Sequence, residues 1–148
     1  MKMRILVSAC LLGVCCRYDG GHAACPEVLA LIRAHELIPV CPEQLGGLPT
    51  PRQPSELRGE GVAARDGADV TRAFRRGAEA ALALARLYGC QAAILKSGSP
   101  SCGHGWVYDG TFTGAKRPGS GVAARLLSQG GLRVVSEKEL AGLFPREG

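Results

Sequence analysis

Cysteines are the residues best able to do chemistry in this 148-residue chain, which contains seven of them. The segment LVSACLLGVCCRYDGG already holds Cys10, Cys15 and Cys16, and the later ones are Cys25, Cys41, Cys90 and Cys102. A high number of cysteines has four possible explanations: a disulfide framework, a lipid anchor, a metal site, or small apolar side chains buried in the core. The surrounding sequence discriminates among these four possibilities.

A disulfide framework is not needed for folding. A chain of 148 residues can bury a core without covalent staples, and an odd number of cysteines cannot all pair within one chain. Disulfide-dense scaffolds are also shorter and secreted. We therefore expect reduced thiols in a cytoplasmic protein whose residues 1–148 form a single domain.

The lipid anchor fails on length. Val7-Ser8-Ala9-Cys10 matches a lipoprotein cleavage box, but Ile5 to Ala9 alone separate Arg4 from Cys10. A signal peptide needs an apolar region of about 7–15 residues, and a membrane span needs ~20. We expect neither export nor a membrane partner.

The formal net charge of +5 raises the question of a nucleic-acid partner. The basic residues are scattered singly or in pairs, and aromatic residues, which stack on single-stranded bases, make up only 5% of the chain. We therefore do not expect nucleic acid to be the partner.

Short apolar runs alternate with longer segments of helical periodicity. The runs predict strands at residues 2–9, 37–43, 91–97 and 132–136. The periodic segments predict helices at residues 26–37, 70–88, 120–129 and 137–144. Asp69 is the expected N-cap of the longest helix and Gly89 its expected stop.

This alternation is typical of an α/β fold with three layers, in which helices cover both faces of a mainly parallel sheet, as in Rossmann-like domains. The segment WVYDGTFTG adds a small β-hairpin around Asp109-Gly110. Residues 46–67 are rich in proline and glycine and are expected to form a long functional or mobile loop.

Three cysteines far apart in sequence converge in this arrangement. Cys10 follows the first predicted strand, Cys41 ends the second, and Cys102 lies in the loop after the third. Ligands of such sheets bind beyond the carboxyl ends of the strands, so the three thiols are expected at one edge. The pattern indicates a metal or cluster site, against the alternative of ordinary buried thiols.

The spacing leaves the identity of the metal open. Zinc would require a fourth ligand, for which the chain offers His22, His104, Cys15 or Cys16, and the local C-x-x-C spacing of structural zinc sites is missing. An iron–sulfur cluster held by only three thiolates would leave one iron open. Cys25 and Cys90 are expected to belong to the core.

Other polar residues fall beside the predicted thiols. Glu43 follows Cys41 by two positions and could act as a general base, although a solvated loop glutamate is the simpler alternative. Ser97, Ser99 and Ser101 in KSGSPSCG could orient a water molecule or stabilise a turn.

Three segments carry a resemblance to a known family: SACLLGVCCRYDGG, VCPEQLGGLPTPR and KSGSPSCGHGWVYDGTFTG. Through them the chain resembles, nearly end to end, a bacterial family that includes the TudS-type thiouracil desulfidases and was formerly described only as a domain of unknown function. The resemblance implies an enzyme with a 4Fe-4S cluster bound by Cys10, Cys41 and Cys102, with one open iron. It also implies that iron–sulfur assembly machinery loads this cluster.

The activity implied by the resemblance is non-redox desulfuration of a small thiolated pyrimidine base such as 4-thiouracil, with release of sulfide, in a hydrolase or lyase reaction. Glu43 matches the family's catalytic glutamate. The catalytic serine lies in SGSPSC, where Ser101 is preferred over Ser99 because it adjoins Cys102. Gly98 stands where the family usually has a basic residue, which concerns substrate contacts.

Two other functions remain compatible with the residues. One is cluster-dependent sulfur handling on another thiolated nucleoside, tRNA or metabolite. The other is a zinc-binding module without catalytic activity.

Overall fold

A parallel sheet of four strands forms the centre of the protein, for which a computed structural model describes residues 2–144. The strands lie in the order β2-β1-β5-β8. Their bounds are β1 (Arg4–Ser8), β2 (Glu36–Val40), β5 (Ala92–Leu95) and β8 (Arg133–Ser136). The predicted strands are confirmed, and all neighbouring pairs are parallel.

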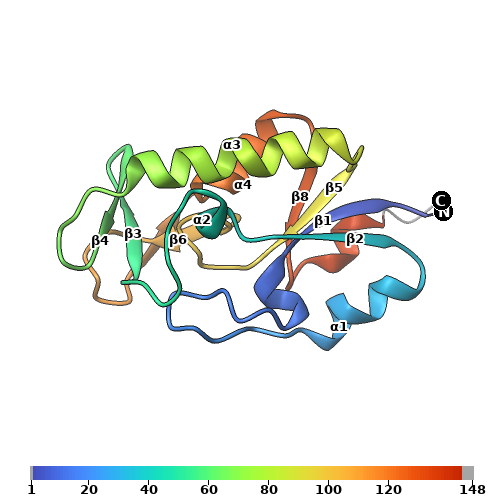
Figure 1. Cartoon of the computed structure of the whole chain (residues 1–148), viewed down its shortest axis with the longest axis horizontal. Coiled ribbons are helices and arrows are strands. Elements are labelled where there is room, and N and C mark those ends of the chain that lie inside the picture. The colour runs from blue at the N-terminus through green and yellow to red at the C-terminus, as the bar shows by residue number, and fades with distance from the viewer. Residues whose placement is uncertain (1, 145–148) are drawn as a thin grey trace.

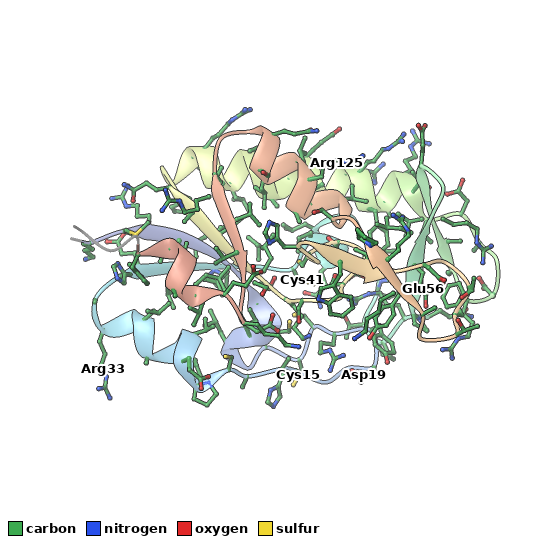
Figure 2. All side chains as sticks on the ribbon, turned by 180° about the vertical axis from the view of Figure 1, so that it is seen from behind. Cys15, Asp19, Arg33, Cys41, Glu56 and Arg125 are labelled. Atoms are coloured by element: carbon green, nitrogen blue, oxygen red, sulfur yellow. The ribbon has the colours of Figure 1, made fainter. Side chains whose placement is uncertain are left out.

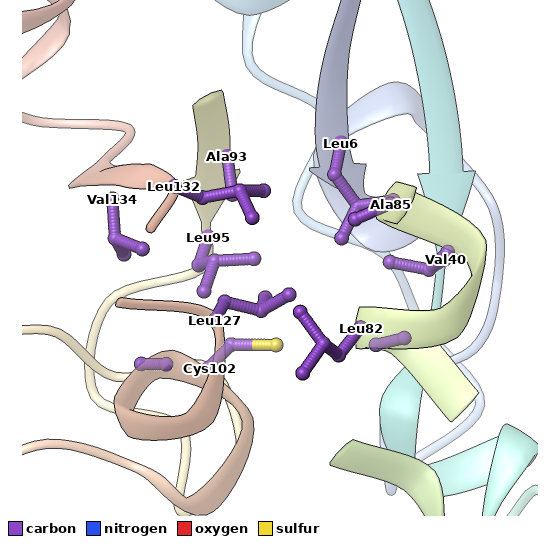
Figure 3. Packing of buried hydrophobic residues seen from close by; sticks show 12 residues of the cluster. Leu6, Val40, Leu82, Ala85, Ala93, Leu95, Cys102, Leu127, Leu132 and Val134 are labelled. Atoms are coloured by element: carbon purple, nitrogen blue, oxygen red, sulfur yellow. The ribbon is translucent and has the colours of Figure 1, made fainter. Parts of the chain in front are cut away.

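One face of the sheet is covered by two helices, α3 (Thr71–Leu87) and α4 (Val122–Gln129). The buried side chains of α3 recur at helical spacing, and with those of α4 they pack on the sheet. Figure 3 shows this cluster, which includes Leu6, Leu82, Leu95, Leu127 and Cys102.

The opposite face is covered by short helical turns. These are η1 (Ala9–Leu12), α1 (Pro26–Leu29), η2 (Ala30–Arg33) and η3 (Leu140–Leu143). A second core cluster, which includes Ile5, Val7, Val28, Ile94 and Leu143, joins them to the sheet. The predicted three-layer α/β fold is thereby confirmed (Figure 1). Arg33 of η2 and Arg125 of α4 are exposed on the outer surfaces of the two helical layers (Figure 2).

Two antiparallel hairpins lie at the end of the molecule opposite the termini (Figure 1). One pairs β3 (Ser55–Arg58) with β4 (Gly61–Ala64). It falls inside residues 46–67, so the prediction that this whole segment is a loop was wrong. The other pairs β6 (Trp106–Tyr108) with β7 (Lys116–Pro118). The predicted hairpin exists, but its second strand starts later because Asp109-Gly110 opens a longer connection.

Helix boundaries follow local signals where those signals are strong. The predicted helices at residues 70–88 and 120–129 are confirmed by α3 and α4. The N-cap of α3 is Val70, which makes no side-chain cap, so the prediction of Asp69 as N-cap was wrong by one residue. Asp69 Oδ1 accepts the amide of Thr71 at 3.0 Å from the position before the N-cap, and Gly89, with a left-handed φ of 65°, follows the helix end as predicted. The segment predicted as a helix at residues 137–144 forms only the 3-10 turn η3.

The prediction of one helix over residues 26–37 was wrong in its second half. The helical turns end at Arg33, and β2 begins at Glu36, which pairs with Arg4 of β1. Glu36 also accepts a hydrogen bond from Arg4 Nε at 2.9 Å. Pairing with β1 therefore overrides the helical periodicity of this segment.

A short helix that the sequence did not predict, α2 (Pro42–Leu45), packs directly against α3. A Cβ added to Gly77 would overlap the carbonyl of Pro42, and one added to Gly46 would overlap the carbonyl of Ala73. Glycine at both positions lets the two backbones touch. This contact fixes the turn that carries Cys41 and Glu43. Within residues 2–144, no helix has the length and apolar character needed to cross a membrane.

Candidate functional site

A cavity of about 380 Å³ opens at the carboxyl edge of the parallel sheet. Residues in the segments that follow β1, β2 and β5 form its inner wall, which includes Cys10, Cys41, Glu43, Ser99 and Cys102. Residues of the two hairpins and their flanking loops form its outer wall, which includes Ser55, Glu56, Arg65, Tyr108 and Phe112. The site therefore lies where the strand ends of an α/β sheet place ligands.

All three predicted thiols line this cavity. Cys10 lies in the turn η1 that follows β1, Cys41 comes directly after β2, and Cys102 lies in the loop after β5. Cys10 is 7% exposed and Cys102 is 5% exposed. Figure 2 shows Cys41 within the molecule, whereas Cys15 lies near its surface. The predicted convergence of the three cysteines is confirmed.

Burial keeps the thiols of Cys10 and Cys102 protonated in the protein without a bound metal. It raises the pKa of Cys10 to about 11, an effect that nearby Lys96 opposes and Cys41 reinforces. Burial also raises the pKa of Cys102, against a hydrogen bond with Ser8 that lowers it. A ligand set of thiolates in this cavity therefore needs a positive charge among the sulfurs.

Of the other candidate ligands, Cys16 alone lines the cavity. Its side chain is 2% exposed, and the thiol of Cys41 donates to the Cys16 carbonyl at 3.7 Å. Cys15 is exposed, His22 accepts the amide of Ala24, and His104 faces Glu139. Within residues 2–144, no three His, Cys, Asp or Glu side chains gather closely enough to hold one metal ion. The thiols instead surround the cavity.

The carboxylate of Glu43 is held by an arginine that sequence reasoning missed. Arg52 Nε lies 3.2 Å from Glu43 Oε1, and the two side chains are only 6% and 16% exposed. The remaining guanidinium nitrogens of Arg52 donate to the carbonyl of Cys16 at 2.9 Å, the carbonyl of Pro49 at 3.2 Å and the hydroxyl of Thr50 at 3.0 Å. Glu43 Oε2 accepts no hydrogen bond from any residue that the structure describes. One oxygen is thus anchored and the other remains available.

The two candidate serines occupy different environments. Ser99 lines the cavity, and its Oγ accepts the amides of Ser101 at 3.1 Å and Cys102 at 2.9 Å. Its own hydroxyl hydrogen is therefore free to be donated elsewhere. Ser101 is fully buried, is not among the residues lining the cavity, and has no partner for its Oγ in the described chain. The third serine, Ser97, binds Glu137 at 3.2 Å.

Position 98, where the resembled family usually has a basic residue, is suited to glycine in this structure. Its φ is 77°, and an added Cβ would lie 2.7 Å from the indole ring of Trp106. The indole therefore packs against the backbone of the loop that carries Ser99, in the space that a side chain at position 98 would take.

The chain matches the family model described as 2-thiouracil desulfurase over residues 5–139. It belongs to this family. It is 46% identical to the uncharacterized protein YbbK of Bacillus subtilis (strain 168) over 146 residues, covering 92% of this chain and 97% of the relative. A solved structure titled as the [4Fe-4S]-dependent thiouracil desulfidase TudS aligns with a TM-score of 0.91 and 46% identity, covering 95% of each chain. The resemblance inferred from the sequence is confirmed.

The donor set of this desulfurase fits an iron–sulfur cluster. Thiolates are the usual ligands of such clusters, and here three thiols from three different strand ends border a single cavity. Their side chains are close enough that the charges of Cys10 and Cys41 affect the pKa of Cys102. A group that is larger than one ion and positively charged at its irons suits both the spread of the sulfurs and their burial.

Proposed function

We propose that this desulfurase removes sulfur from a thiolated pyrimidine base such as 4-thiouracil, using a [4Fe-4S] cluster held by Cys10, Cys41 and Cys102. The observation that carries the proposal is the convergence of these three thiols with Glu43 around one cavity. The activity named for TudS, the 46%-identical structure, supports it.

The number of cysteines bears on what the cofactor would supply. Three thiolates for four irons leave one iron without a cysteine ligand, and such a cluster would supply Lewis-acid chemistry to the sulfur of a thiocarbonyl group. Lys96 lines the same cavity and lowers the pKa of Cys10. Its ammonium group therefore favours the anionic form of the ligand.

Glu43 is the proposed general base. Arg52 anchors Oε1 of this cavity-lining residue, which leaves Oε2 to take a proton from water. Arg52 is a positioning residue in this scheme. It is itself held by the carbonyls of Cys16 and Pro49, which ties the carboxylate to the cysteine loop.

We propose Ser99, rather than Ser101, which adjacency to Cys102 favours, as the serine that orients the water. Both lone-pair positions of the Ser99 oxygen are engaged by the amides of Ser101 and Cys102, so its hydroxyl hydrogen can be donated into the cavity. The buried hydroxyl of Ser101 has no such access.

The overall reaction is balanced without electron transfer. The water oxygen forms a bond to the carbon that carries sulfur, the carbon–sulfur bond breaks, and the products are the oxo base and hydrogen sulfide. This is a hydrolysis. Loading by iron–sulfur assembly machinery, a cytoplasmic location, a single domain and the exclusion of nucleic acid as a partner stay predictions.

The test is sulfide release from 4-thiouracil after anaerobic reconstitution. Glu43→Gln should lower kcat by about 100-fold or more while keeping its iron, because the amide cannot accept the proton. Glu79→Gln, on an exposed position of α3, is the matched control. A reconstituted wild type that releases no sulfide from 4-thiouracil overturns the proposed activity, and a fully active Glu43→Gln overturns the role of Glu43.

A further inference from the structure

The outer wall of the cavity contains a residue in an unfavourable backbone conformation. Phe112, in the connection between β6 and β7, has a φ of 56° and is the one non-glycine residue with positive φ among residues 2–144. An aromatic side chain rarely adopts this conformation, which persists only where the surroundings impose it. Phe112 lines the cavity. Strain of this kind at a cavity wall points to a functional reason for the ring.

A carboxylate from the other hairpin holds Phe112 in place. Glu56 Oε1 accepts the amide of Gly110 at 2.9 Å and the amide of Phe112 at 3.2 Å. Arg58, two residues along β3, donates to the carbonyl of Gly110 at 2.8 Å and 3.3 Å. Figure 2 shows Glu56 at the hairpin end of the molecule, beyond Cys41. One strand of the first hairpin thus fixes the turn of the second.

The aromatic residues of this wall suit a flat ring. Tyr108 and Phe112 contribute aromatic groups, and the guanidinium carbons of Arg58 and Arg65 lie 5.8 Å and 6.0 Å from the centroid of the Phe112 ring. Stacking of a base on an aromatic side chain depends on the π-face and not on a particular hydrogen-bond pattern. The hydrogen-bonding and acid–base groups of the proposed chemistry lie on the inner wall.

We infer that Phe112 is a stacking platform for the heteroaromatic ring of the substrate base, and that Glu56 is the residue that positions it. The inference rests on the proposed function, since it assigns the substrate's ring to the outer wall. Stacking on Phe112 contributes the same binding energy in the ground state and in the transition state. Its loss therefore raises KM and leaves kcat nearly unchanged.

The decisive variant is Phe112→Gly, because glycine adopts the left-handed backbone freely and removes only the ring. Its KM for 4-thiouracil, and the dissociation constant for uracil measured by calorimetry, should rise roughly 5-fold to 100-fold. Its kcat should stay within about twofold, and its thermal midpoint should equal or exceed that of the wild type. Phe112→Tyr should restore tight binding. Tyr88→Ala, an exposed aromatic residue away from the cavity, is the control.

Glu56 is tested by a pair of variants. Glu56→Ala should raise KM because the amides of Gly110 and Phe112 lose their acceptor, whereas Glu56→Gln keeps an acceptor oxygen and should restore KM. If the wild type releases sulfide and Phe112→Gly binds 4-thiouracil and uracil as tightly as the wild type, the inference is wrong although the proposed function stands. A wild type without sulfide release overturns the proposed function instead.

Discussion

The inner and outer walls of the cavity are built by different means. The groups of the inner wall lie in segments that follow strands of the parallel sheet, as Cys41 follows β2, so their positions are set from the rigid core. The outer wall consists of two hairpins that are not part of this sheet. Side-chain bonds such as that of Glu56 to the amide of Phe112 hold them together.

This difference assigns the walls separate tasks. Acid–base groups and metal ligands need positions fixed to a fraction of an ångström, and the sheet supplies them. Substrate selection tolerates adjustment, and hairpins can vary in sequence without disturbing the sheet. Changes in the inner wall should therefore affect kcat and iron content, and changes in the outer wall should affect KM.

The largest effect is expected within the inner wall, from a comparison of two serines. Ser99→Ala should lower kcat by about 100-fold or more because it removes the hydroxyl that faces the cavity. Ser101→Ala should keep kcat within about twofold and keep or raise the free energy of unfolding, because its hydroxyl is buried without a partner. Sulfide release is compared at matched iron content. The reverse pattern would move the catalytic role to Ser101.

A smaller effect is expected at the residue that links the inner wall to its neighbouring loop. Arg52→Ala leaves the carboxylate of Glu43 buried without its cation and should lower the free energy of unfolding by about 3 kcal/mol. Urea unfolding of the cluster-free protein measures this, with the exposed Arg33→Ala as control. The loss should shrink when Glu43→Gln is also present. A loss below about 1 kcal/mol would show that the pair does not hold Glu43.

The smallest effect is expected in the pH dependence of the free energy of unfolding, through Cys10 of the inner wall. Because the folded, cluster-free protein raises the pKa of Cys10 from 9.0 to about 11, the unfolded chain releases this proton first as pH rises. The contribution of the protonated Cys10 thiol to the free energy of unfolding is therefore fully present below pH 9 and is lost as the pH rises from about 9 to 11. Urea unfolding across this range should show a weaker pH dependence for Cys10→Ala than for the wild type. Equal slopes would mean that this thiol is not shielded from water.

The inner wall was predictable because local signals determine it. The apolar run Ile5-Leu6-Val7 predicts a buried strand, and the periodicity of α3 predicts its helix. Once the sheet is parallel, topology alone brings Cys10, Cys41 and Cys102 to one edge. Predicting this convergence required only the strand positions, and no knowledge of contacts between residues distant in sequence.

The outer wall was not predictable to the same degree. Prolines in residues 46–67 suggested a loop, although the turn at Gly59, with a φ of 59°, lies between two segments that pair as β3 and β4. The hydrogen bonds of Glu56 to Gly110 and Phe112 join residues more than 50 positions apart. No sequence pattern marks such bonds.

Single side chains within the inner wall also escaped prediction. Arg52 lies in a segment without periodicity, and its contact with Glu43 arises only from folding. Adjacency to Cys102 favoured Ser101, whereas Ser97 and Ser99 line the cavity and Ser101 does not. Sequence distance from a ligand is therefore a poor guide to orientation. The choice of the catalytic serine stays a prediction.

The most direct test of the account is the content of iron and acid-labile sulfide after anaerobic reconstitution, measured on the wild type and on the Cys10→Ala/Cys41→Ala/Cys102→Ala triple variant. Cys15→Ala/Cys25→Ala is the control for loss of thiols outside the cavity. The account predicts about four irons and four sulfides per chain in the wild type and control, and none in the triple variant. An iron-free wild type, or a triple variant that still binds iron, would contradict it.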